Sequence, residues 1–179
     1  MKYILFLFLI FFSLNIFGQE EKAKKNVVYL EIGGNAFTFM SLNYERTLSM
    51  EKKELLQLAF RLGGSFTETT FDSTITYSTP TEINLLIGKN RLSKGSNYLE
   101  LGVGYTPFFS SSDLVATNIP SHQNHSFYYL MSFRVGYRFV MENSVLFRFG
   151  VLETVFPKTS GDSKVLFKPA IGLSFGYLF

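Results

Sequence analysis

The chain has 179 residues, with no cysteine and no tryptophan, but with 21 phenylalanines, 10 tyrosines and a formal net charge of +3. The lack of cysteine excludes disulfides, thiol catalysis and cysteine–zinc sites, and the small charge excludes the basic footprint of a nucleic-acid-binding protein. The length suits one domain, and an aromatic content of 17% favours β-strands.

The first element in chain order is an export signal. Residues 1–18 carry one cation ahead of an apolar run, which is the layout of a secretory signal peptide. The run is shorter than the ~20 residues that a membrane-spanning helix needs. We therefore predict a signal peptide at 1–18, a short polar lead at 19–26 and one folded domain at 27–179.

The rest of the chain alternates with a period of two, the spacing of a β-strand whose faces differ. In residues 126–140, Phe133 and Val135 lie on a face of large apolar side chains, and Arg134 and Arg138 lie on a face of small and charged ones. Seven other segments alternate in the same way, and no amphipathic helix competes with them. The eight predicted strands cover residues 27–37, 39–48, 56–63, 82–88, 97–106, 126–140, 145–152 and 165–179.

The connections between these strands alternate in length. The short ones follow the second, fourth and sixth strands, at 49–54, 89–96 and 141–143, and the long ones follow the third, fifth and seventh, at 66–80, about 108–125 and 156–164. An antiparallel array places all the short connections at one end and all the long ones at the other. The first connection, at 35–38, is an exception, since it belongs to the long end but is tight.

The volume of the apolar face decides which way it points. An eight-stranded barrel has an interior only just wide enough to be filled by side chains, and the large apolar side chains of eight strands do not fit inside it. The other face, rich in Gly, Ser and Ala, suits a narrow lumen. Arg or Lys facing lipid would cost roughly 2–4 kcal/mol each at the bilayer midplane. We predict an all-β fold, an eight-stranded antiparallel up-and-down transmembrane β-barrel with its apolar face outward.

Charged residues from every part of the chain lie on the predicted lumen face. Isolated buried charge is costly, so we expect an interlocked cluster of ion pairs that plugs the lumen. The alternative for this cluster is a proton or ion path. Its predicted members are Glu31, Glu45, Arg61, Glu82, Glu100, Arg134, Arg138, Arg148 and Lys168.

The chain ends in an apolar strand instead of a polar tail. Its predicted outward face carries Ile171, Leu173, Phe175, Tyr177 and Phe179. This ending resembles the C-terminal signature of bacterial outer-membrane β-barrels. The stretch 31–48, with Gly-Gly-Asn leading into Ser-x-Asn-Tyr-Glu-Arg, resembles the first hairpin of small, porin-like and largely uncharacterised members of that family. The resemblance implies a location in the bacterial outer membrane, contact with outer-membrane lipid and recognition by the barrel-assembly machinery during insertion.

Two features depart from that family's pattern. Pro169 lies inside the last predicted strand, where it removes a hydrogen-bond donor and indicates a bulge or a position near the outer rim. Because the chain lacks Trp, the aromatic girdles expected at both membrane interfaces must be built from Tyr and Phe. Candidates are Tyr44, Tyr105, Tyr137 and Tyr177.

Catalytic candidates are few. The two histidines, His122 and His125, lie near Ser121 and Ser126, as a serine hydrolase at the barrel rim would require, but the H-x-S arrangement of the outer-membrane lipid A deacylases is absent. Two histidines alone do not complete a metal site. We predict no cofactor, no metal and no nucleic-acid partner.

We therefore expect a non-enzymatic outer-membrane β-barrel with a plugged polar lumen and a structural, adhesive or loop-mediated binding role. The external connections, such as the Ser- and Thr-rich segment 67–79, are candidate surfaces for a partner or glycan. A narrow pore for ions or small solutes is the first alternative. A lipid-modifying enzyme with its site at the rim is the second.

Overall fold

The computed structural model describes residues 25–36, 38–48, 55–69, 74–89, 95–113, 123–156 and 166–179. The predicted signal peptide at 1–18 and most of the polar lead at 19–26 lie outside these residues and stay predictions. The described strands are β1 (Asn26–Gly33), β2 (Met40–Leu48), β3 (Leu56–Thr69), β4 (Thr74–Ser78), β5 (Thr81–Lys89), β6 (Ser96–Asp113), β7 (Gln123–Val140), β8 (Val145–Phe156) and β9 (Leu166–Leu178). One short helix, η1 (Gly34–Ala36), follows β1, and no helix of the described residues is long and apolar enough to cross a membrane.

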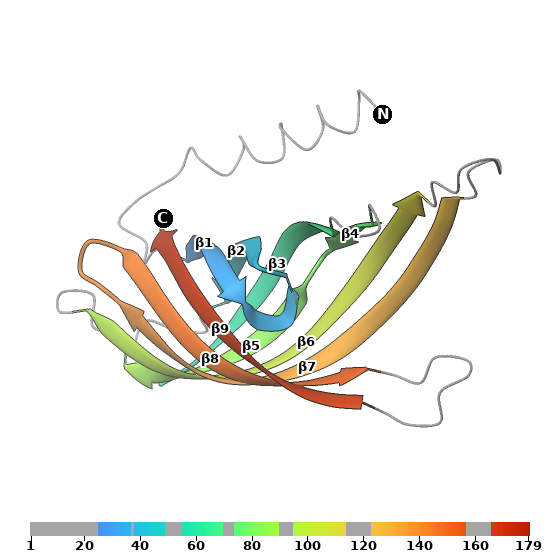
Figure 1. Ribbon diagram of the computed structural model, residues 1–179. Coiled ribbons are helices and arrows are strands. Elements are labelled where there is room, and N and C mark those ends of the chain that lie inside the picture. The colour runs from blue at the N-terminus through green and yellow to red at the C-terminus, as the bar shows by residue number, and fades with distance from the viewer. Residues whose placement is uncertain are drawn as a thin grey trace, which may run out of the picture.

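The strands form one closed antiparallel barrel (Figure 1). Apart from β4 and β5, strands that follow one another in the chain are paired, and β1 closes the barrel by pairing with β9 from Val27↔Leu178 to Gly33↔Gly172. β4 and β5 both lie between β3 and β6 and share one position in the wall. The predicted eight-stranded barrel is therefore confirmed, with one of its eight positions divided between two strands.

The division between β4 and β5 occurs at a proline. Pro80 has no N–H to donate to a sheet, so the regular ladder stops there. The Gly63 amide donates to the Pro80 carbonyl at 2.7 Å, and the Thr79 amide donates to the Pro107 carbonyl at 3.3 Å. These two bonds hold the divided strand between its neighbours.

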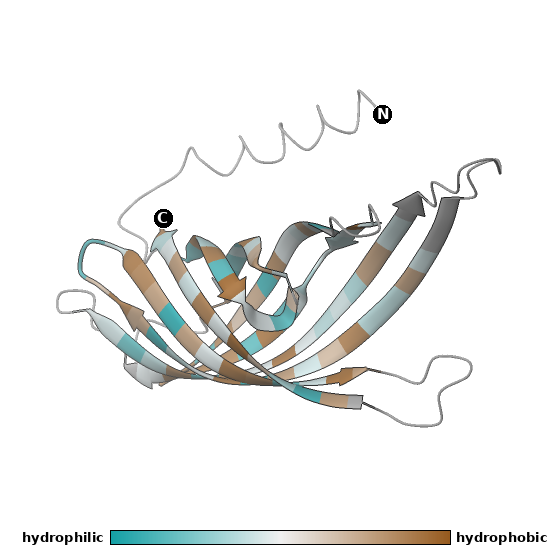
Figure 2. Cartoon of the chain, in the orientation of Figure 1, coloured by the Kyte–Doolittle hydropathy of each residue, from teal (hydrophilic) through white to brown (hydrophobic). Residues whose placement is uncertain are grey.

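The apolar face of the barrel points outward, as predicted. Hydropathy alternates along the strands (Figure 2). Phe133, Phe147 and Leu173 are 53%, 43% and 52% exposed, whereas Arg134 and Arg148 are each 2% exposed. The large side chains surround the cylinder and the arginines fill it.

Two predicted connections contain substantial strand. The segment 66–80 continues β3 to Thr69 and contains β4, and the segment 108–125 extends β6 to Asp113 and includes the start of β7 at Gln123. The prediction of loops here was wrong because Ser and Thr are frequent in the parts that form strands, 66–78 and 108–113. These residues also suit strands where they alternate with aromatic ones.

The barrel wall is complete at one end only. We call the end with the short connections and Phe179 the turn end, and the other the loop end. Pairing between β2 and β3 stops at Leu42↔Gly64, as that between β1 and β9 stops at Gly33. Toward the loop end, residues 166–171 of β9 therefore have no paired strand on the side of β1, and residues 65–69 of β3 have none on the side of β2, among the described residues. We call the gap between these two strand edges the open side.

Candidate functional site

Eight of the nine predicted lumen charges meet inside the barrel, where each is at most 2% exposed. Four carboxylates balance four guanidinium groups. They come from β1 (Glu31), β2 (Glu45), β3 (Arg61), β5 (Glu82), β6 (Glu100), β7 (Arg134 and Arg138) and β8 (Arg148). The cluster thus ties together seven of the eight positions of the wall. We call these eight residues the lumen cluster.

Glu82 is the centre of the lumen cluster. Its carboxylate lies 2.9 Å from Arg61 Nη1, 2.7 Å from Arg134 Nε and 3.1 Å from Arg148 Nη2. The side-chain amide of Asn35, in η1, donates a fourth hydrogen bond at 3.0 Å. One acid thus serves three arginines, so its removal would leave three buried cations short of a partner.

Glu31, on β1, forms ion pairs with two of the same arginines. It pairs with Arg61 and, at 2.9 Å, with Arg134. The Ser174 hydroxyl, from β9, lies 3.4 Å from the same carboxylate. Through this contact the eighth position of the wall also reaches the cluster.

Arg138 forms the part of the cluster nearest the turn end. Its guanidinium donates to Glu45 at 2.9 Å and to Glu100 at 3.1 Å. Glu100 also pairs with Arg148. The ion pairs are therefore continuous from Glu31 through Glu82 to Glu45.

Tyr29 is a neutral member of the site that the sequence analysis did not single out. Its hydroxyl accepts a hydrogen bond from Arg148 Nη1 at 2.7 Å. The guanidinium carbons of Arg61 and Arg148 each lie 5.5 Å from the ring centroid, within cation–π range. The ring thus packs between two cations that would otherwise repel each other.

Two asparagines add hydrogen bonds to the cluster. Asn43 Oδ1 accepts from Arg61 Nε at 2.9 Å and from Nη2 at 2.8 Å. With its amide nitrogen turned toward the carboxylates, Asn84 donates to Glu82 at 2.7 Å and to Glu100 at 3.0 Å. The sequence analysis did not name these asparagines, although both alternate in sequence with outward residues, and this position on the lumen face could have identified them.

Lys168, the ninth predicted member, lies outside the cluster. Its ammonium lies 5.5 Å above the Phe156 ring, its side chain is exposed, and no ion pair links it to an acid among the described residues. Although Lys168 is on the lumen face of β9, it lies beyond Gly172, where pairing with β1 ends. The wall is open there, so solvent reaches the side chain.

The first connection, which the sequence marked as unusually tight, folds into the lumen. Gly34, Asn35 and Ala36 are buried, and η1 packs against β6, β8 and β9 (Figure 1). Gly33 and Gly34 have φ values of 72° and 73°, which favour glycine. A Cβ on Gly34 would collide with the Glu31 carboxylate, so this turn fits against the cluster only without a side chain.

An apolar layer lies on the other side of the cluster. At the turn end, lumen-facing side chains form two buried groups, Val27 with Tyr29 and Leu146, and Ala59 with Leu86 and Tyr98. From the turn end upward, the lumen thus contains apolar side chains, then ion pairs, then η1. These three layers make up a continuous plug.

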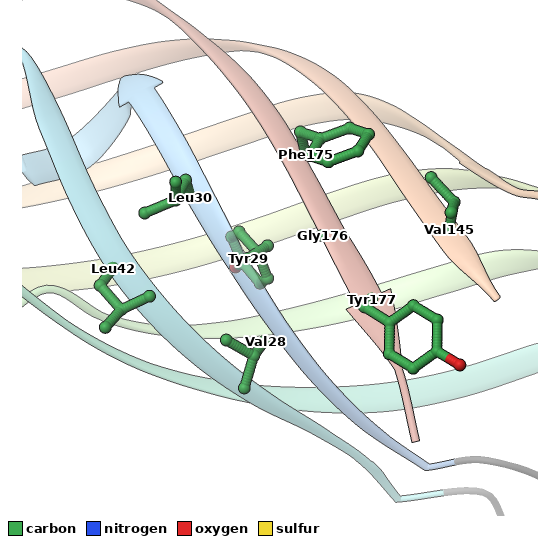
Figure 3. A pocket seen from close by; sticks show the side chains of 8 residues that line it. All are labelled: Val28, Tyr29, Leu30, Leu42, Val145, Phe175, Gly176 and Tyr177. Carbon is green, nitrogen blue, oxygen red and sulfur yellow. The ribbon is translucent and has the colours of Figure 1, made fainter.

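A depression on the outer surface lies over the seam between β1 and β9 (Figure 3). Its volume is about 230 Å³, and it is lined by Val28, Tyr29, Leu30, Leu42, Val145, Phe175, Gly176 and Tyr177. It contains no charged residue. It is therefore a shallow irregularity of the apolar outer face and offers no catalytic group.

The aromatic candidates for the girdles and the C-terminal residues all lie on the outer face. Tyr105, Tyr137 and Tyr177 are 40–51% exposed, and the half-buried Tyr44 donates its hydroxyl to Asn26 Oδ1 at 2.8 Å. The five residues of the C-terminal signature, Ile171, Leu173, Phe175, Tyr177 and Phe179, are 44–60% exposed. Their recognition during assembly stays a prediction.

The histidine hypotheses are not tested by the structure. His122 lies outside the described residues, and His125 contributes its backbone to β7. Among the residues that are described, no group of three or more His, Cys, Asp or Glu side chains is placed to hold a metal ion.

Solved structures with a similar fold are outer-membrane proteins. A major outer-membrane protein from Thermus thermophilus aligns with a TM-score of 0.52 and 15% identity, over 87% of this chain and 100% of that one. Neisserial surface protein A aligns at 0.47 and 11%, over 87% and 95%, and Ail, the attachment invasion locus protein of Yersinia pestis, at 0.46 and 11%, over 87% and 97%. No protein-family model matches the sequence, and neither does any curated protein. The chain thus has the fold of the small eight-stranded outer-membrane β-barrels.

Proposed function

We propose that this protein is a bacterial outer-membrane β-barrel that neither conducts nor catalyses, and that acts through the structures it presents at its loop end. The role is structural, adhesive or one of binding a partner. The observation that carries this proposal is the continuous plug. Ion pairs with side chains no more than 3% exposed join the walls of the lumen, between an apolar layer and η1.

The outer surface supports a membrane location. Phe66, Tyr77, Phe109 and Phe127 are neighbours in register across β3, β4, β6 and β7, and they are 50–72% exposed. Tyr137 and Tyr177 are exposed near the turn end. Aromatic residues at both ends of an apolar band are the girdles expected at the two interfaces of an outer-membrane barrel.

The two longest connections between strands, 114–122 and 157–165, both lie at the loop end, which supports an orientation with the turn end in the periplasm and the loop end outside the cell. Outer-membrane barrels have short periplasmic turns and longer external loops. In this orientation the extended strands β6 and β7 rise on the external side, and the C-terminal residue lies at the periplasmic interface. Insertion by the barrel-assembly machinery through the C-terminal strand is part of the proposal.

Membrane fractionation and a heat-mobility gel test the location. We expect the protein in the outer-membrane fraction, with an unboiled form that migrates differently from the boiled form because the folded barrel resists the detergent. A soluble protein whose mobility does not change on boiling would contradict the proposal.

Planar-bilayer recording tests the plug against the pore alternative. We expect wild-type protein to give no steady openings, because the lumen cluster and η1 are buried within the lumen. Steady wild-type openings that disappear when Arg134 or Glu100 is replaced would show that the cluster is an ion path instead.

Incubation with outer-membrane lipids tests the enzyme alternative. We expect identical lipid profiles with and without the folded protein. Lipid conversion that is lost in the variants His122→Ala and His125→Ala would contradict a non-enzymatic role.

A further inference from the structure

The open side interrupts an apolar surface. Phe167 and Ile171 on β9 are 62% and 60% exposed, and Phe66 on β3 is 72% exposed, so apolar side chains flank both of its edges. The backbone groups on those edges have no strand partner among the described residues. In hydrocarbon each such group would cost several kcal/mol, so polar atoms must reach the edges of this gap.

The apolar surface also continues beneath the open side. Next to η1, Phe39 is 80% exposed, and Ile32 and Met40, which pair with each other at the ends of β1 and β2, are 50% and 47% exposed. The gap is thus bordered by apolar side chains on three sides. A molecule that fills it must be amphipathic, with an apolar part for this border and a polar part for the edges.

Two charged groups flank the open side, Glu68 on the outer face of β3 and Lys168 on β9. Lys168 faces the lumen side of β9 and has no acid partner among the described residues. The carboxylate nearest in register, Glu153, is opposite Pro169 and projects outward, to the other face of the sheet. The Lys168 ammonium contacts the Phe156 ring but no acid among the described residues, and an ammonium in a membrane protein calls for an anion.

We propose that the open side binds one anionic lipid of the surrounding leaflet, with its headgroup phosphate at Lys168 and its acyl chains along Phe167, Ile171 and Phe39. This inference rests on the proposed membrane location. The headgroup oxygens and their bound water supply the polar partners for the unpaired edge of β9.

A peptide strand fits this gap less well than a lipid does. Pro169 lies in the unpaired part of β9 and has no N–H to donate, and Lys168 precedes it. Proline and lysine are the residues with which natural edge strands resist the addition of another strand. The position of Pro169 also agrees with the expectation that it lies near the rim.

Fluorescence quenching tests the proposal, because the chain has no native Trp. The variant Phe167→Trp places a reporter next to Lys168, and Phe109→Trp places a matched reporter on β6, away from the open side. Each is folded into phosphatidylcholine vesicles that contain brominated phosphatidylglycerol or brominated phosphatidylcholine. We expect the reporter at 167 to show about fivefold preference for the anionic lipid, and the reporter at 109 to show none.

Charge variants then locate the site. Lys168→Gln should abolish the preference at 167, whereas Arg46→Gln, which removes an exposed cation from β2, should leave it unchanged. Inorganic phosphate should not displace the lipid. The proposal is overturned by equal preference at both reporters, by a preference that survives Lys168→Gln, or by displacement with phosphate, which would indicate a site for free anions.

The heat-mobility gel on the same vesicles separates this inference from the proposed function. If the barrel shows the folded mobility and brominated phosphatidylcholine quenches both reporters, the membrane location holds, and a missing preference contradicts only the lipid site. If neither reporter is quenched, the membrane location itself is wrong.

Discussion

The two ends of the lumen have the same alternating sequence pattern but different contents. Toward the turn end, the inward face carries charges that are buried and paired, with Glu82 at their centre. Toward the loop end, the same face carries Ser and Thr that bond to one another, such as the half-buried Ser65 with the buried Ser78 at 2.6 Å. Lys168 has no acid partner among the described residues.

The difference follows from the lengths of β1 and β2. Where both strands are present, the wall is closed and water is excluded, so every charge requires a partner. Beyond Gly33 and Met40 the wall is open, and a lone lysine is tolerated because solvent or headgroups reach it. In this barrel, the burial of the lumen-facing charges therefore depends on how far the β1–β2 hairpin extends toward the loop end.

Of the variants considered, Glu82→Ala is expected to lower the free energy of unfolding most, because it acts in the closed, charged part of the lumen. It removes one acid from three buried arginines, and breaking a buried ion pair from one side costs about 3–5 kcal/mol. Urea titration of the folded barrel in vesicles, read by heat mobility, measures the loss of unfolding free energy. The matched control Glu142→Ala changes an exposed turn residue and should have no effect, so equal losses would mean that the lumen cluster does not stabilise the barrel.

Gly34→Ala is expected to have the next largest effect. A side chain at φ 73° costs about 1–2 kcal/mol, and the new Cβ would also displace Glu31 from its arginines. The matched control is Gly64→Ala, because a Cβ there meets nothing within 4 Å. If the two variants are equally stable in urea, η1 does not close the lumen in the way the structure indicates.

The closed half of the barrel was the more predictable half. A period of two places every residue on one of two faces, and the cost of charge in lipid decides which face is inside. Alternation therefore located Glu82 and Arg148 correctly, and it puts Asn43 and Asn84 on the same face. It gives no information on which partners meet across the lumen, because that depends on strand register and on the tilt of the strands in the barrel.

The loop-end half of the barrel was less predictable, because the alternating pattern does not show where β1 and β2 end. By its position in the alternation, Lys168 faces inward like the members of the lumen cluster. It is exposed because β1 ends at Gly33 and does not cover this part of β9. The insertion of η1 depends on Gly33 and Gly34, whose sequence reads equally as an ordinary tight turn. In the extended strands, Ser and Thr beside Phe66 and Tyr77 gave the composition of a loop.

Glu153→Leu tests the outer face and is expected to stabilise the barrel. Glu153 is exposed on β8, opposite Phe133 and Pro169, within the apolar outer surface. A carboxylate facing lipid is unfavourable, though less so than Arg or Lys, so we expect a gain of about 1 kcal/mol in unfolding free energy. Glu142→Leu, outside the strands, is the control. A loss of stability at position 153 would show that this carboxylate has a partner in the membrane.

The smallest expected effect compares one aromatic pair from each end of the barrel. Phe147 and Phe175, near the turn end, have ring centroids 5.0 Å apart, and Phe109 and Phe127, near the loop end, have theirs 5.1 Å apart. Both are directly opposed across neighbouring strands. Double-mutant cycles to Leu should give each pair a coupling of about 0.5 kcal/mol.

Equal couplings would mean that the sheet at the loop end is as firmly packed as the closed barrel, although it has an unpaired edge. A coupling confined to Phe147 and Phe175 would mean that packing weakens where β1 and β2 end. In that case the extended strands derive their order from their main-chain pairing, and the aromatic row on their outer face contributes to membrane contact more than to stability.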